Sequence, residues 1–225
     1  MAAEKVQARF AFMTSLPALL LAFLLAATTS AEPRFGPDYV DVSRYALQLD
    51  IRYATTNNFT GKNLYGDFRA CFLHREAAGK LQNAVKNLNQ SRPGWKFLVF
   101  DCLRPRSVQK ILYAAVAGTS KQSYVAHPAG GSIHNFGFAM DLSLVDAQGR
   151  EVDMGTPYDA FEPLAEPVRE QEFLKSGRLT QTQHANRLIL RSAMQQAGFI
   201  QLGNEWWHFD AKPAAEVRTK YRIIE

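Results

Sequence analysis

The sequence has little of what defines the specialised classes of protein. Two cysteines in 225 residues are too few for a disulfide-dense mini-protein or a four-cysteine zinc site. The excess of 26 lysines and arginines over 21 aspartates and glutamates is small and dispersed, unlike the clustered basic residues typical of nucleic-acid binding. With 47% hydrophobic and 21% charged residues, the composition excludes disordered, collagen-like and multi-span membrane chains. The length and composition indicate one ordinary globular domain that binds no nucleic acid.

The N-terminal segment differs from the rest of the chain. Lys5 and Arg9 form a short positive region, an apolar stretch covers residues 10–27, and small residues lead up to Ala31. This layout is typical of a secretory signal peptide. An uncleaved anchor is the alternative, but the uninterrupted apolar part is shorter than the roughly 20 residues that a membrane span needs. We therefore expect residues 1–31 to be a signal peptide, and residues 32–225 to form the exported domain without a membrane span.

Export affects how the two cysteines are interpreted. Cys71 and Cys102 would reach an oxidising compartment, in which a disulfide is chemically permitted. Two buried free thiols are the alternative, because the sequence does not measure the distance between them in the fold. The sequence leaves both possibilities open.

Hydrophobic patterns in the mature chain predict a mixture of strands and helices. The segment 155–178, rich in proline, glutamate and glycine, is expected to be a long surface excursion. Turn residues at 146–149 favour a hairpin, and hairpins favour an antiparallel sheet. We predict an α+β fold in which helices flank a mainly antiparallel sheet. The expected strands are 47–53, 96–100, 138–145, 199–202 and 206–210. The expected helices are 68–88, 182–197 and one that begins at Pro105. The buried face of this last helix is expected to consist of Val108, Ile111, Leu112, Ala115 and Val116.

Two segments place a histidine close to a carboxylate in the sequence. His134 lies in a loop and precedes Asp141, on a predicted strand, by seven residues, and His208 lies near the C-terminus. Catalytic zinc sites use three protein ligands, with imidazole nitrogen and carboxylate oxygen among the preferred donors, and leave one position for water. Each residue alone could be an ordinary hydrogen-bonded side chain. Together they predict a metal site, because a carboxylate within an apolar strand needs compensation.

Two further residues offer catalytic chemistry. Glu205, three residues before His208, could act as a general base if the strand is bulged or just ending there; otherwise it is a surface glutamate at a turn. Arg104 lies where a strand should end and a helix begin, and its fixed charge could stabilise an oxyanion. The alternative for Arg104 is a helix-flanking residue paired with a surface carboxylate.

These motifs resemble a known family. Ser-x-His-x6-Asp, Glu-Trp-Trp-His and an upstream Asp-x-x-Arg-Pro are similar to the zinc D-alanyl-D-alanine dipeptidases of the vancomycin-resistance type. That family belongs to a larger group of zinc D,D-peptidases that shares an α+β fold with the Hedgehog signalling domain. The segments 58–62 and 154–159 also resemble the dipeptidases. The chain departs from the family pattern at Cys102-Leu103, where a small-aromatic pair is usual before the arginine, and this bears on substrate preference.

The resemblance implies hydrolysis of the D-Ala-D-Ala dipeptide with one zinc ion per chain. The expected signal peptide points to the periplasm, and this location favours turnover or salvage of cell-wall peptides over antibiotic resistance, for which an enzyme of this type would be expected in the cytoplasm. The alternatives are a carboxypeptidase or endopeptidase acting on peptidoglycan stem peptides, and a zinc-binding module without activity, against which Glu205 argues. The sequence does not indicate the oligomeric state. The resemblance assigns His134, Asp141 and His208 as zinc ligands, Glu205 as general base, Arg104 as the transition-state stabiliser, Asp159 as the partner of the substrate's amino group and Ser132 as a substrate contact.

Overall fold

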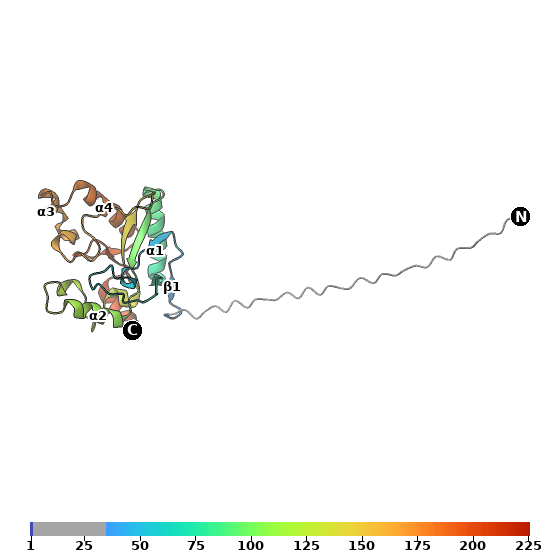
Figure 1. Cartoon of the computed structure of the whole chain (residues 1–225), viewed down its shortest axis with the longest axis horizontal. Coiled ribbons are helices and arrows are strands. Elements are labelled where there is room, and N and C mark those ends of the chain that lie inside the picture. The colour runs from blue at the N-terminus through green and yellow to red at the C-terminus, as the bar shows by residue number, and fades with distance from the viewer. Residues whose placement is uncertain (2–34) are drawn as a thin grey trace. The chain divides into compact units, whose positions relative to one another are not determined.

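The computed structural model describes Met1 and residues 35–225 (Figure 1). The described residues from Phe35 onward belong to one compact unit. The predicted signal peptide lies outside the described residues. Within residues 35–225, no helix has both the length and the hydrophobicity to cross a bilayer.

A five-stranded sheet forms the centre of the fold. Its strand order is β2-β4-β5-β7-β6; β2 pairs with β4 in parallel, and every other neighbouring pair is antiparallel. The strands β1 and β3 form a separate antiparallel pair. This architecture confirms the predicted α+β fold with a mainly antiparallel sheet. The strands are β1 (Tyr39–Asp41), β2 (Leu47–Leu49), β3 (Phe72–His74), β4 (Lys96–Asp101), β5 (Ala139–Val145), β6 (Ile200–Gln201) and β7 (His208–Asp210).

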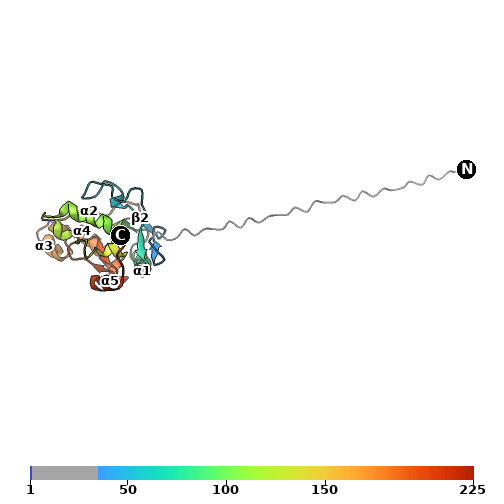
Figure 2. The same ribbon diagram turned by 90° about the horizontal axis from the view of Figure 1, so that it is seen from below.

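Helices flank this sheet. The two longest, α1 and α4, pack against each other, and α1 runs alongside the sheet (Figure 1). Figure 2 shows α2 and α5 on either side of the C-terminus of the chain. Short 3-10 turns occupy several connections. The helices are α1 (Arg75–Ser91), α2 (Arg106–Val116), α3 (Glu170–Lys175), α4 (Gln181–Gln196) and α5 (Ala214–Lys220), and the 3-10 turns are η1 (Arg52–Ala54), η2 (Gln122–Tyr124), η3 (Ile133–Phe136), η4 (Pro163–Ala165) and η5 (Pro167–Arg169).

Two predicted elements have different boundaries in the structure. The expected helix over 68–88 begins only at Arg75, because Phe72–His74 pairs with β1 and the His74 side chain then caps the helix by accepting from the Glu76 N–H. The expected strand over 47–53 ends at Leu49, and Tyr53 is buried in the turn η1 instead. In both cases tertiary contacts override the local hydrophobic pattern.

Helix α2 begins after Pro105, as predicted, but its buried face is partly different. Val108, Leu112 and Val116 are buried, whereas Ile111 is 46% exposed and Ala115 is exposed as well. Gln109 takes a fully buried position because its side chain bonds Arg104 and the Ala126 carbonyl. A polar residue therefore occupies part of the face for which the pattern predicts only apolar residues.

The segment 155–178 lies mostly at the surface, as expected, but it is ordered and anchored rather than a plain excursion. The segment contains η4, η5 and α3, and Phe173 is buried. Arg187 of α4, fully buried, donates to the carbonyls of Met154 and Leu164 and lies 3.4 Å from the Glu170 carboxylate. A buried charge stays stable only when it is paired and hydrogen-bonded in this way. The segment is thus fixed to the rest of the fold.

A disulfide joins Cys71 and Cys102 across a Cα–Cα distance of 5.4 Å. Of the two possibilities that the sequence leaves open, the structure has the bridged one. The bridge ties the end of β4 to β3, and the Leu103 N–H donates to the Phe72 carbonyl beside it. The segment that follows β4 is therefore held on one side by a covalent bond.

Candidate active site

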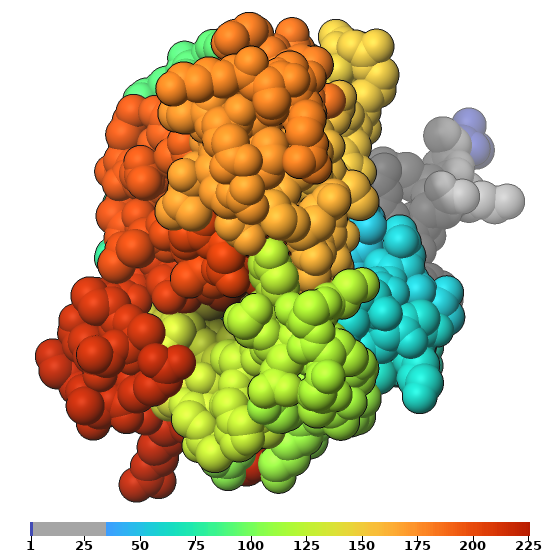
Figure 3. All heavy atoms as spheres, turned by 90° about the vertical axis from the view of Figure 1, so that its left-hand side faces the viewer, coloured from blue at the N-terminus to red at the C-terminus, as the bar shows by residue number. Residues whose placement is uncertain are grey.

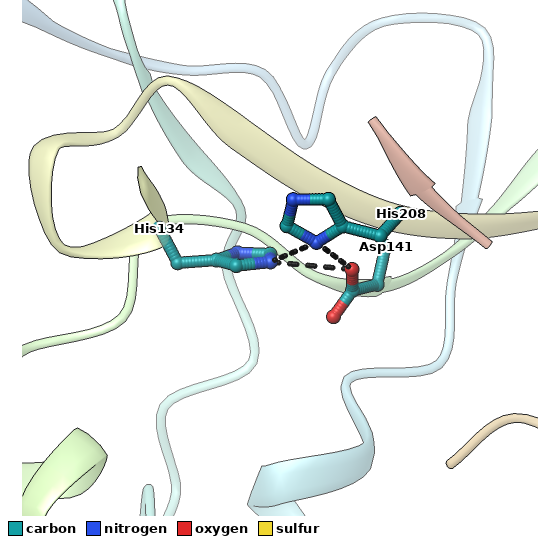
Figure 4. A group of neighbouring side chains, drawn as sticks. All are labelled: His134, Asp141 and His208. Atoms are coloured by element: carbon teal, nitrogen blue, oxygen red, sulfur yellow. Dashed lines mark hydrogen bonds and ion pairs between the residues drawn. The ribbon is translucent and has the colours of Figure 1, made fainter. Parts of the chain in front are cut away.

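Three predicted ligands converge at one point of the sheet (Figure 4). Asp141 on β5 and His208 on β7 are cross-strand partners, so their side chains lie on the same face of the sheet. His134 reaches the same point from η3. Asp141 Oδ1 lies 2.9 Å from His208 Nδ1 and 3.2 Å from His134 Nε2, and the two ring nitrogens are 3.1 Å apart. All three side chains are buried.

The second nitrogen of each imidazole ring faces an oxygen acceptor. His134 Nδ1 lies 2.7 Å from the Cys102 carbonyl oxygen, and His208 Nε2 lies 2.9 Å from Asp210 Oδ1. Since a carbonyl or a carboxylate oxygen only accepts, these outer nitrogens carry the ring protons. The two inner nitrogens then present lone pairs to each other and to Asp141.

This arrangement fits a divalent metal ion. Three electron pairs pointing at one another at about 3 Å repel, and a cation between them turns that repulsion into coordination. Imidazole nitrogens with a carboxylate oxygen are a donor set that zinc accepts, and outer acceptors that fix the histidine tautomers are typical of such sites. His134, Asp141 and His208 are therefore the residues that would hold the metal.

The turn η3 positions His134. Ser132 Oγ accepts from the His134 N–H at 3.4 Å, while Asn135 Oδ1 accepts from the Ser132 N–H at 2.7 Å, which is a capping box. Asn135 Nδ2 also donates to the Arg104 carbonyl at 2.6 Å. Gly137 ends the turn with φ of +72°, a conformation that favours glycine. The local hydrogen bonds of the sequence Ser-Ile-His-Asn-Phe-Gly thus fix the position of the His134 imidazole.

Glu205 lies in the turn between β6 and β7 and not within a strand. Its carboxylate Oε2 is 3.9 Å from His208 Nδ1, which places the carboxylate beside the three converging atoms. Burial raises the pKa of the Glu205 carboxyl to about 8. A divalent cation at the three converging atoms would favour the ionised carboxylate and bring that pKa down. The side chain is 6% exposed, which excludes the alternative of a surface glutamate.

Arg104 is buried and held by two neighbours. Its Nε donates to Asp101 Oδ2 at 2.8 Å, its Nη1 donates to Gln109 Oε1 at 2.8 Å, and its Nη2 lies 2.7 Å from Asp101 Oδ2. The same Nη2 is 3.5 Å from Asp141 Oδ2. The guanidinium carbon lies over the Tyr53 ring, 5.0 Å from its centroid. Arg104 is thus a preorganised positive charge beside the metal ligands, and its carboxylate partner is buried.

Asp159 adopts a left-handed backbone conformation, with φ of 59°, which aspartate tolerates better than most residues. Its carboxylate oxygens each lie 3.4 Å from the Tyr53 hydroxyl, and the Phe59 backbone N–H also bonds to it. The preceding Tyr158 donates to Asp141 Oδ2 at 3.0 Å. Burial, together with the nearby Asp141 charge, raises the pKa of Asp159 well above its usual value. An ammonium group beside Asp159 would relieve this penalty.

A cavity of about 180 Å³ connects these residues. Figure 3 shows a hollow between the C-terminal segment (red), the segment around residue 165 (orange) and the segment around residue 125 (yellow-green). The volume is below the roughly 300–1,000 Å³ that is usual for drug-sized ligands, so a small ligand is favoured. All seven residues singled out from the sequence line the cavity: Arg104, Ser132, His134, Asp141, Asp159, Glu205 and His208.

Five supporting residues were missed. Two of them left a signal in the sequence. Asp210 lies two residues after His208 on the same strand, and Asp101 precedes Arg104 by three residues. Tyr158 lies in a segment that resembles the family but has no role assigned from the sequence, and the other two left no signal. The five are Asp210, Asp101, Gln109, Tyr53 and Tyr158.

A buried His-Asp-His group, next to a carboxylate and an arginine in a small cavity, defines the site of a metallopeptidase. Residues 36–224 match the family model described as D-ala-D-ala dipeptidase, and the chain belongs to this family of peptidases. The family resemblance read from the sequence motifs is confirmed.

Named relatives agree with this assignment. A D-alanyl-D-alanine dipeptidase of Escherichia coli (strain K12) is 31% identical over 176 residues, covering 75% of this chain and 81% of the relative. A D-alanyl-D-alanine dipeptidase of Enterococcus faecium is 29% identical over 191 residues, covering 77% and 90%. One from Streptomyces coelicolor is 27% identical over 197 residues, covering 77% and 90%.

The hydrogen bond from His208 to Asp210 yields a prediction about metal affinity. Asp210→Ala removes the acceptor that fixes the tautomer of His208, so we expect the affinity for zinc to fall by about 10- to 100-fold. Titration with a competing chelator measures this. Asp67→Ala, at an exposed carboxylate, is the matched control. Equal zinc affinity of the Asp210 variant and the control would show that Asp210 does not support the site.

Proposed function

We propose that this protein is a zinc-dependent dipeptidase that hydrolyses D-Ala-D-Ala into two molecules of D-alanine. The observation that carries the proposal is a small cavity lined by a candidate general base next to three candidate metal ligands. The residues are Glu205, His134, Asp141 and His208, and Asp159 lines the same cavity. The family membership and the names of the relatives give the substrate class.

A zinc ion held by His134, Asp141 and His208 would supply Lewis acidity, which lowers the pKa of a water molecule and polarises the scissile carbonyl. Glu205 accepts the proton of the attacking water as the oxygen forms its bond to the carbonyl carbon. The same carboxyl then delivers the proton to the leaving nitrogen as the C–N bond breaks. Burial raises the pKa of the Glu205 carboxyl above that of free glutamate, which suits a group that first accepts and then returns a proton.

Arg104 has a separate task in this reaction. As the water attacks, negative charge develops on the carbonyl oxygen, and a fixed guanidinium nearby stabilises it. Asp101 and Gln109 hold the guanidinium in place before substrate arrives, so little reorganisation accompanies the reaction. Arg104 thus acts through charge and position.

Asp159 and Ser132 contribute to binding. The carboxylate of Asp159 suits the free ammonium group of a dipeptide, because pairing removes the penalty of a buried, uncompensated charge. The Ser132 hydroxyl caps η3 with its oxygen, which leaves its O–H available to a ligand in the cavity. A longer peptide lacks an ammonium group at this position and leaves Asp159 unpaired, so the arrangement discriminates against stem peptides.

We further propose that the enzyme is exported to the periplasm and acts there on released cell-wall dipeptides in turnover or salvage. Two observations support this: the layout of residues 1–31, and the disulfide between Cys71 and Cys102, which is stable in oxidising compartments.

The proposed activity can be tested with two substrates and one variant. We expect the protein to release free amine from D-Ala-D-Ala but little from a stem pentapeptide, to lose activity with a chelator, and to regain it with zinc. Glu205→Gln should lower kcat by about 10²- to 10⁴-fold while zinc binding is retained, because the amide cannot accept the proton. Glu172→Gln, at an exposed glutamate, is the control. Cleavage of the pentapeptide alone would instead identify a carboxypeptidase or endopeptidase.

Asp159→Asn tests how the dipeptide is oriented. Without the negative charge, we expect KM for D-Ala-D-Ala to rise about 10-fold or more with a smaller change in kcat. N-acetyl-D-Ala-D-Ala, which lacks the ammonium group, should be a poor substrate for the wild type. In the variant, the ratio of its kcat/KM to that of the free dipeptide should rise. An unchanged preference between the two substrates would remove Asp159 from substrate binding.

Export predicts a defined mature chain. When the full sequence is expressed in a Gram-negative bacterium, the protein released by osmotic shock should begin at Glu32, as measured by intact mass. The site follows from the small residues that end at Ala31. Recovery of the full-length chain from the cytoplasm alone would contradict the proposed location.

A further inference from the structure

The cavity contains an arginine that the proposed mechanism does not use. Arg218 lies on α5 and lines the cavity together with Ala214 of the same helix. Arg104 is the other arginine in the lining of this cavity, to which no lysine among residues 35–225 contributes. The two arginines differ in how far their charge is already compensated.

Arg104 is committed to its neighbours. Its three guanidinium nitrogens contact Asp101 and Gln109, and Asp141 lies within 3.5 Å. Arg218, in contrast, donates only to backbone carbonyls: Nε to Gly130 at 3.3 Å and Nη2 to Gly131 at 3.1 Å. Within residues 35–225, no carboxylate forms an ion pair with Arg218. Its charge is therefore available to a ligand.

The position of Arg218 is fixed by the surrounding chain. Helix α5 packs against η3, and the Ile224 N–H that follows it donates to the Asn135 carbonyl at 2.8 Å. The carbonyl groups that Arg218 bonds directly precede Ser132. Arg218 thus lies beside the part of the cavity lining that carries Ser132 and His134, while Asp159 comes from a different segment of the chain.

A free dipeptide brings two charges into this cavity. Its ammonium group matches Asp159, and its terminal carboxylate requires a cation that no carboxylate already neutralises. We infer that Arg218 binds the terminal carboxylate of the substrate. This inference rests on the proposed dipeptidase function and adds to it the group that recognises the leaving D-alanine unit. Guanidinium suits this role because its N–H groups match a carboxylate in geometry as well as charge.

The consequence is recognition of substrate length at both ends. Asp159 selects peptides whose N-terminus is on the residue just before the cleaved bond. Arg218 selects peptides whose C-terminus is on the residue just after it. Because Arg218 is exposed, its contribution is screened and smaller than that of a buried pair. Its effect should therefore appear in KM and not in the chemical step.

Two substrates and three variants test the role of Arg218. We expect the wild type to prefer D-Ala-D-Ala to D-Ala-D-alaninamide, which lacks the terminal carboxylate. In Arg218→Gln, KM for the free dipeptide should rise roughly 10-fold, kcat should change little, and kinetics with the amide should stay as in the wild type. Arg218→Lys should recover part of the loss because it restores the charge. Arg222→Gln, at an exposed arginine that does not line the cavity, is the matched control.

The outcomes separate this role from a structural one and from the proposed activity. An equal loss with both substrates in Arg218→Gln would mean that Arg218 only supports the loop at Gly130 and Gly131, and would overturn the inference. So would an unchanged KM for the free dipeptide. Failure of the zinc-loaded wild type to cleave either substrate would instead overturn the proposed function itself.

Discussion

Everything in this site depends on three electron-rich atoms that meet inside an apolar fold. His134 Nε2, His208 Nδ1 and Asp141 Oδ1 lie 2.9 to 3.2 Å apart, and the outer nitrogen of each ring is already bonded to an acceptor. With the outer nitrogens protonated and the inner ones bare, the three atoms repel one another, and a divalent cation between them would relieve that repulsion. The antiparallel pairing of β5 with β7 supplies two of these atoms from directly opposed positions, which explains why the strands are buried and rigid here.

The segment from Asp101 to Arg104 connects the metal ligands to the catalytic charge. The Cys102 carbonyl orients His134, Asp101 holds Arg104, and the Arg104 carbonyl accepts from Asn135 in the ligand turn. The disulfide fixes the same four residues to β3. Cysteine at position 102, which departs from the family pattern, is therefore part of the support of the site, and its backbone still performs the orienting task.

The sequence predicted the residues of the site better than the boundaries of the helices and strands. His134, Asp141, His208 and Glu205 could be found because a metal site needs particular side chains, and the structure brings them together with Arg104, Asp159 and Ser132. The mainly antiparallel sheet and most element positions also followed from hydrophobic periodicity and turns, whereas the strand order was not predicted. Tertiary contacts prevailed in two places: β3 delays α1, and Arg187 anchors the segment 155–178. Gln109 and Tyr53 could not be found, since a buried amide or phenol is recognisable only through the group that it bonds in the fold, here Arg104 and Asp159.

The charges that line the cavity explain why a small dipolar ligand suits it. Asp141, Asp159, Glu205 and Asp210 provide four acidic groups, whereas Arg104 and Arg218 provide two fixed positive charges. A divalent cation would balance two of the acids, and Asp101 outside the cavity already offsets Arg104, so two acids and the Arg218 guanidinium are left. Of these, Asp159 and Arg218 are the two groups proposed to meet the charged ends of a dipeptide. A neutral apolar ligand would leave both of these unpaired, and an anion or a cation would satisfy one of them. Under the proposed assignment a zwitterionic dipeptide would pair with both, so the charges of the cavity favour a ligand that carries one charge of each sign.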